Sequence, residues 1–240
     1  MADDNIFIYT DVFSLILNLV NINDLPKFFC LSKSIHSFML YHYFRTQITL
    51  NKVPLSYIKT NADHLHTLIL FGDEYIEDDF LKILPKLRHL ELPANRHITN
   101  EGLQYISSIT VLNLGWNHKI TDEGLKYIPL ITNLNLRCTD MITDVGLQYI
   151  PLVTYLDLHW NNMITDVGLQ HIPLVTYLDL HWNEKITNSG LKFIPAVTTL
   201  DLFCNGNITR TGLKFIHSVT KLSMHACDVI TVTFFKKLIF

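Results

Sequence analysis

The sequence predicts an α/β solenoid, in which short parallel strands form one sheet and short helical segments cover its other face. Three observations predict this fold. Isoleucine recurs every 22 residues from Ile76 to Ile230 without a shift. Each period contains an L-x-L stretch with the alternation of a strand, and a G-L-x-x-I stretch with the spacing of a helical turn. Because one strand and one turn cannot bury their leucines alone, the copies must stack into a continuous core.

Each period can be read in order, for example "ITDEGLKYIPLITNLNLRCT" from residue 120. The Thr or Asp before the Gly-Leu pair is a candidate N-cap of the helical turn, and the Pro ends that turn. The L-x-L stretch then forms the strand, with its leucines inward and the residues beside them outward. A residue at one fixed position after each strand predicts a buried amide ladder that satisfies backbone groups where the chain turns. The ladder comprises Asp73, Asn95, Asn117, Thr139, Asn161, Asn183 and Asn205.

The repeat divides the chain into two parts. Residues 54–240 hold about eight coils of 22 residues, the first of them degenerate, and end in a half-coil that starts at Ile230. We expect this half-coil to fold back as an amphipathic helix, because the open end of a solenoid must be covered. Residues 6–48 lack the repeat and cluster their apolar residues with helical spacing, which predicts a separate small α-helical domain.

Composition and charge narrow the classes of function. The apolar fraction of 48% is sufficient for a core, and the net charge of −3 argues against a nucleic-acid-binding surface. The start "MADDN" is acidic where a secretory signal is basic, and no apolar run reaches the roughly 18 residues that span a bilayer. The four cysteines lack the paired spacing of a disulfide framework or a structural zinc site. We therefore expect a cytosolic or nuclear protein with no membrane partner and no cofactor.

The stretch "LDLHWNNMITDVGL", residues 156–169, resembles a leucine-rich repeat. It matches the pattern L-x-x-L-x-L-x-x-N and continues into the I-T-D-x-G-L segment found in F-box leucine-rich-repeat proteins. The resemblance covers residues 54–240 and implies a parallel sheet on a concave face with short helices on the convex face. The coils here are a few residues shorter than in that subfamily and have Asn where Cys is usual, so the ligand chemistry of known members is not carried over.

The stretch "IYTDVFSLILNLVNINDLPKFFCLSKSIHSFM", residues 8–39, resembles an F-box, although Tyr9-Thr10 stands where Leu-Pro is usual. The resemblance implies a substrate-recognition subunit of a cullin-RING (SCF-type) ubiquitin ligase, in which residues 6–48 bind a Skp-family adaptor and the repeats hold a target protein. The implied adaptor-binding residues are Val12, Ile16, Leu19, Leu25 and Leu31. The alternative is a free-standing leucine-rich-repeat scaffold whose N-terminal helices only cap the core.

The outward residues of the strands predict the target site. A near-exact copy of one coil doubles Tyr, Asp, His and Trp on consecutive strands, and an acidic stripe beside aromatic side chains suits a basic or aromatic segment of a partner. Rim packing of the tryptophans and a solvated polar face are the alternatives. The residues that we expect to bind the target are Tyr155, Asp157, His159, Trp160, Tyr177, Asp179, His181, Trp182, Asp201 and Phe203.

The sequence predicts binding rather than catalysis. Asp157 and His159 share a strand face, but no nucleophile pairs with them, because the repeat phase turns Cys204 toward the rim. The sequence has no glycine-rich phosphate loop and no G-x-S-x-G motif. We expect no metal ion, on the reasoning that a flat, exposed ladder of side chains lacks convergent ligands.

Overall fold

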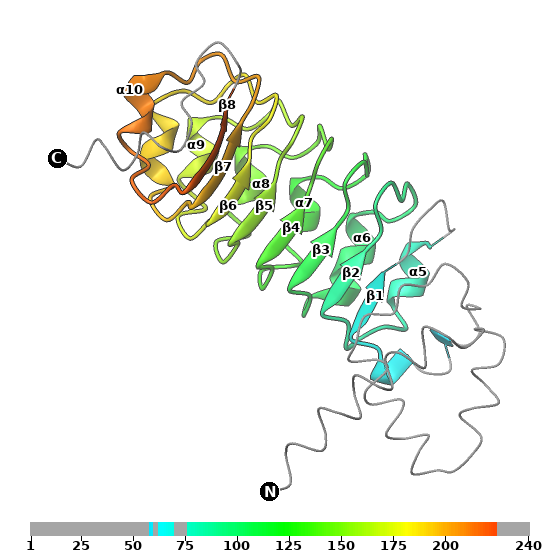
Figure 1. Ribbon diagram of the computed structural model, residues 1–240. Helices are drawn as coiled ribbons and strands as arrows, with labels where there is room; N and C mark the ends of the chain where they lie inside the picture. The colour runs from blue at the N-terminus through cyan, green and yellow to red at the C-terminus, as the bar shows by residue number, and fades with distance from the viewer. Residues whose placement is uncertain (1–57, 60–61, 70–75, 225–240) are drawn as a thin grey trace, which may run out of the picture.

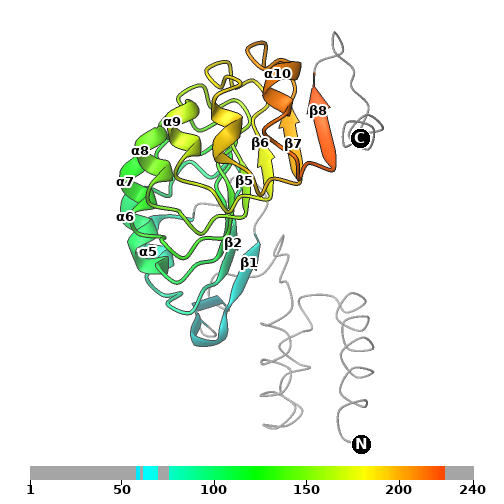
Figure 2. The ribbon, with the colours of Figure 1, turned by 90° about the vertical axis from the view of Figure 1, so that its left-hand side faces the viewer.

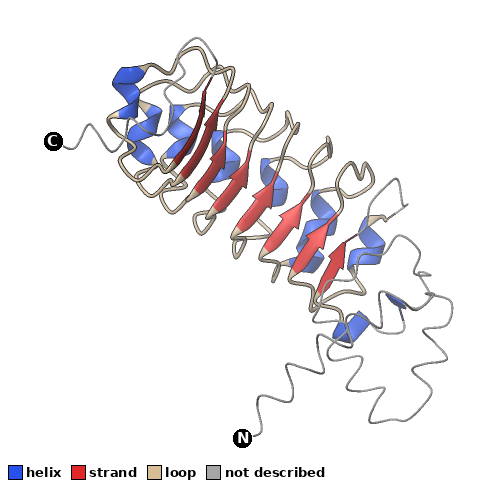
Figure 3. Ribbon diagram, in the orientation of Figure 1, coloured by secondary structure: helices blue, strands red, loops and turns tan. Residues whose placement is uncertain are grey.

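Eight short strands pair in parallel, in chain order, and form one sheet (Figure 3). Every strand pair has the same register, in which each residue lies opposite the residue 22 positions later, as Leu156 lies opposite Leu178. The strands are β1 (Thr67–Ile69), β2 (His89–Glu91), β3 (Val111–Asn113), β4 (Asn133–Asn135), β5 (Tyr155–Asp157), β6 (Tyr177–Asp179), β7 (Thr199–Leu202) and β8 (Lys221–Met224). The predicted period and strand positions are therefore confirmed.

The computed structural model describes residues 58–59, 62–69 and 76–224 (Figure 1). The predicted helical domain of residues 6–48, with all five adaptor-binding residues, lies outside the described residues, and so does the C-terminal half-coil. These predictions remain untested by the fold.

Short helices cover one side of the sheet, and Figure 2 shows them on the outer side of an arch whose inner side is formed by the strands. The α-helices are α5 (Asp78–Leu81), α6 (Asn100–Leu103), α7 (Asp122–Leu125), α8 (Asp144–Leu147), α9 (Asp166–Leu169) and α10 (Arg210–Leu213). The 3₁₀ helices are η2 (Ala62–His64), η3 (Gln104–Ile106) and η4 (Gly190–Phe193). The solenoid thus has a convex helical face and a concave sheet face, as the pattern predicts.

The leucines and isoleucines of the repeat form one continuous core between the sheet and the helices. In the coil around β6, the aliphatic side chains that point inward are all fully buried. They are Ile164, Leu169, Ile172, Val175, Leu178 and Leu180. At about 1.5–3 kcal/mol for each buried side chain, apolar burial dominates the stability of a coil, and this burial exists only when neighbouring coils are present.

The predicted amide ladder is present only in part where the strands end. Asp73 lies outside the described residues, Asn183 donates to the Leu158 carbonyl but its Oδ1 has no partner among the described residues, and neither side-chain amide atom of Asn205 has one. Asn161 is fully buried; its side-chain Nδ2 donates to the backbone carbonyls of Thr139 and Ile142, and its Oδ1 accepts from the backbone N–H of Met163. Asn95 and Asn117 make equivalent bonds in their own coils. These bonds satisfy backbone groups that the turn would otherwise leave unpaired in the core.

A second ladder joins the convex helices of successive coils. Oδ1 of Asp144, the first residue of α8, accepts from the backbone N–H of Thr165 at 2.8 Å, and its Oδ2 accepts from the Thr165 hydroxyl at 2.6 Å. Thr165 in turn is the N-cap of α9, and its hydroxyl accepts from the backbone N–H of Val167. The sequence offered either Thr or Asp as the N-cap, and the structure shows that the threonine is the N-cap. The aspartate instead links one coil to the next.

This convex ladder also explains the glycine of the I-T-D-x-G pattern. A Cβ at Gly168 would lie 2.4 Å from Oδ1 of Asp144, closer than side-chain atoms can approach. The other described repeat glycines, Gly102, Gly124, Gly146, Gly190 and Gly212, face the same obstacle from an Asp or Asn one coil earlier. Glycine is required at this position because it leaves room for the inter-coil hydrogen bonds.

Candidate functional site

All ten residues predicted to bind the target lie together on and just beyond three neighbouring strands of the concave face. The register pairs Tyr155 with Tyr177 and Asp157 with Asp179, and then Asp179 with Asp201. The parallel hydrogen bonding continues past the ends of the strands, because the Trp160 N–H donates to the His181 carbonyl at 2.9 Å. We call these ten residues the central patch.

The two tyrosines of the central patch stack on each other. Their ring centroids are 4.1 Å apart and the ring planes are 8° from parallel. Burial raises the pKa of both phenols above the ordinary value, so both are protonated at neutral pH and their hydroxyls can donate hydrogen bonds. The pair forms a rigid, flat aromatic surface of the kind that protein interfaces favour.

The aspartates of the central patch are more buried than the sequence analysis expected. The alternative of a solvated polar face requires exposed carboxylates, but Asp157 is buried, with 8% of its surface exposed, and the Asp179 side chain is 14% exposed. The curvature of the sheet brings the side chains of the concave face together and excludes solvent from them. The alternative of a solvated polar face is therefore wrong for these two residues.

Burial also changes the acidity of these carboxyl groups. Burial raises the pKa of Asp157, and the opposing effects are the hydrogen bond from the His159 N–H, the charge of Arg137 and the hydrogen bond from the Asn135 side chain. Burial raises the pKa of Asp179 to about 6, and the charge of Asp157 adds to this shift. Ionised carboxylates held here at neutral pH carry an unfavourable electrostatic energy, which a cation would relieve.

The two histidines complete the central patch beyond the aspartates. The ring centroids of His159 and His181 are 4.2 Å apart, and the His181 ring contacts Phe203 edge-on with centroids 4.8 Å apart. Burial lowers the pKa of His159 to about 4, with help from the charge of Arg137, so this imidazole is neutral at pH 7. Nε2 of His181 is buried and has no hydrogen-bond partner among the described residues.

The three tryptophans stand in a row at the end of the strands, at the phase predicted from the repeat. Each has between 41% and 47% of its surface exposed, and neighbouring rings meet edge to face with centroids 6.3 and 6.4 Å apart. Such exposure argues against simple rim packing. The backbone φ angles of Trp116, Trp160 and Trp182 are 66°, 59° and 60°, a left-handed conformation that is uncommon for bulky residues.

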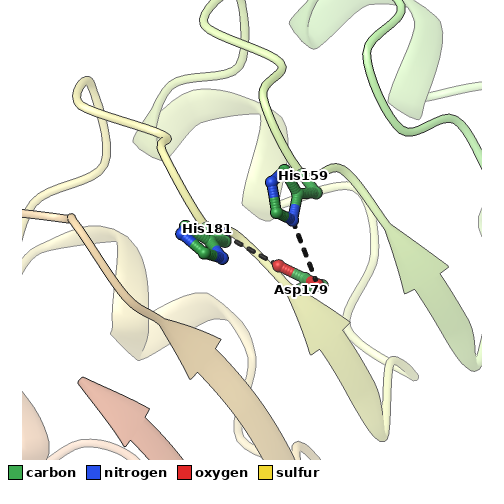
Figure 4. A group of neighbouring side chains, drawn as sticks. All are labelled: His159, Asp179 and His181. Atoms are coloured by element: carbon green, nitrogen blue, oxygen red, sulfur yellow. Dashed lines mark hydrogen bonds and ion pairs between the residues drawn. The ribbon is translucent and has the colours of Figure 1, made fainter. Parts of the chain in front are cut away.

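Figure 4 shows His159, Asp179 and His181 gathered at the ends of two adjacent strands. Oδ1 of Asp179 accepts from the His181 backbone N–H at 2.9 Å, and Nδ1 of His159 lies 3.8 Å from Oδ2 of the same carboxylate. One ligand atom from each of the three residues lies within 4.8 Å of the others. The expectation that concave side chains do not converge is thus wrong at this point.

Sequence reasoning missed two neighbours of the central patch, Asn135 and Arg137, both on the preceding coil. Nδ2 of Asn135 donates to Oδ2 of Asp157 at 3.1 Å, and Arg137 is exposed beside the histidines and aspartates. Their positions one period before Asp157 and His159 were visible in the sequence. The signal that could have found them is a pair of changes between successive coils, from the amide of Asn135 to the carboxylate of Asp157 and, two positions later, from the guanidinium of Arg137 to the imidazole of His159.

Comparison with known families identifies the repeat. The model of the leucine-rich-repeat family matches residues 84–107, 105–128, 129–150, 151–172, 171–194 and 196–216. These matches cover more than half of the chain, so the protein belongs to the leucine-rich-repeat family. No curated protein matches the chain.

Solved structures agree on the fold. Internalin C2 of Listeria monocytogenes is 24% identical, with 72% of this chain and 77% of that chain covered and a TM-score of 0.57. An internalin (InlF) of the same organism is 19% identical, with 84% and 59% covered and a TM-score of 0.60. A chain in the crystal structure of the yeast Rad7 and Elc1 complex is 20% identical, with 59% and 43% covered and a TM-score of 0.51. At these identities the likeness concerns the solenoid fold alone.

Among the described residues, no helix is both long enough and apolar enough to cross a membrane.

Proposed function

We propose that this protein is a non-catalytic receptor that holds a partner protein on the concave face of its repeats, with the central patch as the centre of the contact. The observation that carries the proposal is the combination, on the concave face, of a stacked tyrosine pair, a row of exposed tryptophans and carboxylates that are mostly buried. Leucine-rich-repeat solenoids present extended concave surfaces of this kind to their partners. Aromatic residues are the commonest strong contributors to protein interfaces.

The partner that suits this surface is a basic segment with aromatic or methylene-rich side chains, lying across the strands. Successive contact rows repeat at the strand spacing, roughly 4.8 Å, so an extended segment can meet one row after another. The carboxylates of Asp157, Asp179 and Asp201 attract cationic side chains, and the stacked rings of Tyr155 and Tyr177 offer faces to Lys or Arg. This chemistry agrees with the sequence prediction.

Within this receptor function we further propose a role as the substrate-recognition subunit of an SCF-type ubiquitin ligase, localised in the cytosol or nucleus. The support is the F-box resemblance of residues 8–39 and the order in which an F-box precedes the repeats. The solved structure of the Rad7 and Elc1 complex adds that a chain with a similar fold occurs in complex with another protein. Residues 6–48 bind the Skp-family adaptor in this proposal, and the repeats hold the target.

The free-standing scaffold is the second candidate, and one observation favours it. The family matches begin at residue 84 and leave residues 6–48 unmatched. In this case the N-terminal helices cap the core, and the concave face binds its partner without an adaptor. Both candidates use the central patch, so only adaptor binding separates them.

The adaptor test uses the purified full-length chain and a purified Skp-family adaptor. We expect a complex on gel filtration that is lost when Leu25 and Leu31 are both replaced by Ala, because these leucines match the F-box pattern and not the repeat. The matched control is the Tyr155→Ala/Tyr177→Ala variant, which leaves residues 6–48 unchanged and should bind the adaptor normally. A folded wild-type chain that does not bind the adaptor would favour the scaffold.

The site test compares two double variants for capture of the partner that co-purifies with the wild-type chain. Tyr155→Ala/Tyr177→Ala should weaken capture more than Asp157→Asn/Asp179→Asn, because aromatic anchors contribute about 2 kcal/mol or more each. Raising the salt concentration should slow association without abolishing the complex. The control is Tyr127→Ala, which removes an exposed tyrosine beside α7 on the convex face. Wild-type affinity in both double variants would place the contact elsewhere.

A further inference from the structure

The convergence of His159, Asp179 and His181 is a feature that partner binding alone does not explain. The three ligand atoms lie within 4.8 Å of one another, and Nδ1 of His159 lies 3.8 Å from Oδ2 of Asp179. A zinc ion with tetrahedral bonds of about 2.0–2.2 Å separates its nitrogen and oxygen ligands by about 3.3–3.6 Å. Small side-chain rotations would therefore bring the three atoms into coordination distance.

The supporting groups around these ligands are already in place. The His181 N–H holds Oδ1 of Asp179 at 2.9 Å, which fixes the carboxylate and leaves Oδ2 directed toward His159. Hydrogen bonds of this kind orient metal-ligating carboxylates in known sites. The histidine and aspartate side chains are mostly shielded from solvent, with exposures of 12% for His159 and 14% for Asp179.

A second observation, independent of the ligand distances, points to a missing partner. Nε2 of His181 is buried without a hydrogen-bond partner among the described residues. A buried unpaired ring nitrogen costs stability unless something binds it. The carboxylate that pairs with the His159 ring is that of Asp179, at 3.8 Å.

The surrounding charge favours a cation. Three carboxylates, Asp157, Asp179 and Asp201, act on one another here, and the cation among the described residues that opposes them is Arg137, so the ionised groups sum to a formal charge of −2. A divalent ion would neutralise this charge. Two imidazoles with one carboxylate select a transition metal over calcium or magnesium, which prefer oxygen ligands alone.

We propose that His159, Asp179 and His181 bind one divalent transition-metal ion, with zinc as the test ion, at the centre of the concave face. Three protein ligands leave a coordination position open, as in sites that bind a further ligand. Duplication of one coil created the site, because it placed the second histidine at the same phase on the next strand. The proposal does not depend on the receptor function, since metal binding is measured without any partner.

The test is titration of the untagged, full-length, chelator-treated protein with zinc by calorimetry, followed by cobalt(II) titration with visible absorption as the readout of coordination by protein ligands. We expect one saturable site. His159→Gln, Asp179→Asn and His181→Gln should each weaken zinc binding by more than about 100-fold, since even outer partners of metal ligands contribute 10- to 100-fold. In the wild type, zinc should also raise the melting temperature.

Two control variants separate this site from general attraction of zinc to a protein with 12 histidines. His118→Gln removes an exposed histidine two residues past Trp116, and Asp201→Asn removes a neighbouring charge but no ligand. Both should keep the site, with a change of only a few-fold for Asp201→Asn. No saturable binding, or equal binding in the three ligand variants and the wild type, would overturn the proposal. Metal-free melting of every variant confirms that each one is folded.

Discussion

The convex and concave faces of this solenoid both stack acidic side chains every 22 residues. The carboxylates of the two faces differ in how many hydrogen bonds they accept. On the convex face, Asp144 accepts two hydrogen bonds from Thr165 of the next coil, one at each carboxylate oxygen. On the concave face, Asp179 accepts one bond from the backbone of its own coil, and its second oxygen has only the His159 ring at 3.8 Å. The convex aspartate is thus fully paired and the concave one is not.

This difference shows that repetition alone does not tell a structural residue from a binding residue. A paired carboxylate at the start of a helix joins coils and stabilises the fold. A half-buried carboxylate beside two others, with a raised pKa, opposes folding at neutral pH. The convex ladder therefore supports the solenoid, while the concave column does not, and we propose that its role is binding. Four substitutions can sharpen or break this comparison.

The largest effect should come from the glycine that makes room for the convex ladder. In Gly168→Ala, the added Cβ would lie 2.4 Å from Oδ1 of Asp144 and displace the carboxylate from Thr165. We expect a loss of about 2–4 kcal/mol in the free energy of unfolding, the scale of two charge-assisted hydrogen bonds. The measurement is urea unfolding of purified variants.

Two controls make the glycine test specific. Gly206→Ala adds a Cβ with nothing within 4 Å, so it should change stability by no more than about 0.5 kcal/mol. Adding Asp144→Ala to Gly168→Ala removes the obstacle, so the alanine at 168 should cost much less in that background. Equal costs with and without Asp144 would show that the ladder is not what requires glycine.

The next effect concerns the aspartate of the convex ladder itself. Asp144→Ala should destabilise the protein by about 2–3 kcal/mol, because the Thr165 N–H and hydroxyl lose their acceptors. Asp144→Asn should cost far less, since Asn100 and Asn188 occupy the same position in other coils and bond the next threonine through Oδ1 and Nδ2. If Asn were as damaging as Ala, charge and not hydrogen bonding would hold the coils together.

Much of the fold could be predicted from the sequence, because the 22-residue period fixes the strand positions, the register and the inward leucines at once. The proximity of the ten central-patch residues followed from the same period, while their role in binding stays a prediction. The Asp144–Thr165 bond could not be predicted, since it joins residues of different coils and depends on how closely the helices stack. Its trace in the sequence is the glycine 24 residues after each Asp or Asn of the ladder, whose meaning appears only when the coils are stacked.

The burial of the concave side chains was beyond sequence reasoning for a different reason. A repeat pattern specifies which residues face the concave side, but not how strongly the sheet curves, and curvature determines whether those side chains crowd together. The burial of Asp157 and the close approach of the His159 and His181 rings both depend on this curvature. The left-handed backbone at Trp160 was likewise invisible, because nothing in the residue type predicts it.

A smaller effect, of opposite sign to the convex one, should come from Asp179→Asn. The folded-state pKa of about 6 lies above the roughly 3.9 of an unfolded chain, so the ionised carboxylate opposes folding above pH 6. In the presence of a chelator, the Asn variant should be more stable than the wild type at pH 7.5, by on the order of 1 kcal/mol after solvent screening. The gain should shrink as the pH falls from 6 to 4, where the wild-type carboxyl becomes protonated.

Melting curves of Asp179→Asn and the wild type at pH 7.5 and pH 4.5 measure this effect. Asn keeps the acceptor for the His181 N–H, so only the charge is removed. A destabilised variant at pH 7.5 without metal would mean that the concave carboxylate is structural, like Asp144, and the comparison between the two faces would fail. A stabilised variant that no longer binds zinc would separate the ligand role from folding.

The smallest effect on stability is expected at Trp160, where the backbone and the side chain can be tested separately. Trp160 has φ of 59°, a conformation that costs a non-glycine residue about 1–2 kcal/mol and that glycine adopts freely. In Trp160→Gly this relief opposes the lost ring contacts with Trp116 and Trp182 and the greater entropy of the unfolded chain. The net change in the free energy of unfolding should stay within about 1 kcal/mol. The N–H bond to the His181 carbonyl is kept.

Capture of the partner, in contrast, should fall by about 10-fold or more, because an exposed ring at the edge of the central patch contributes to binding and not to the core. Urea unfolding and capture assays on the same preparation decide the point: a large loss of stability with unchanged capture would show that the tryptophan row packs the rim of the solenoid, whereas the reverse pattern assigns it to the binding surface.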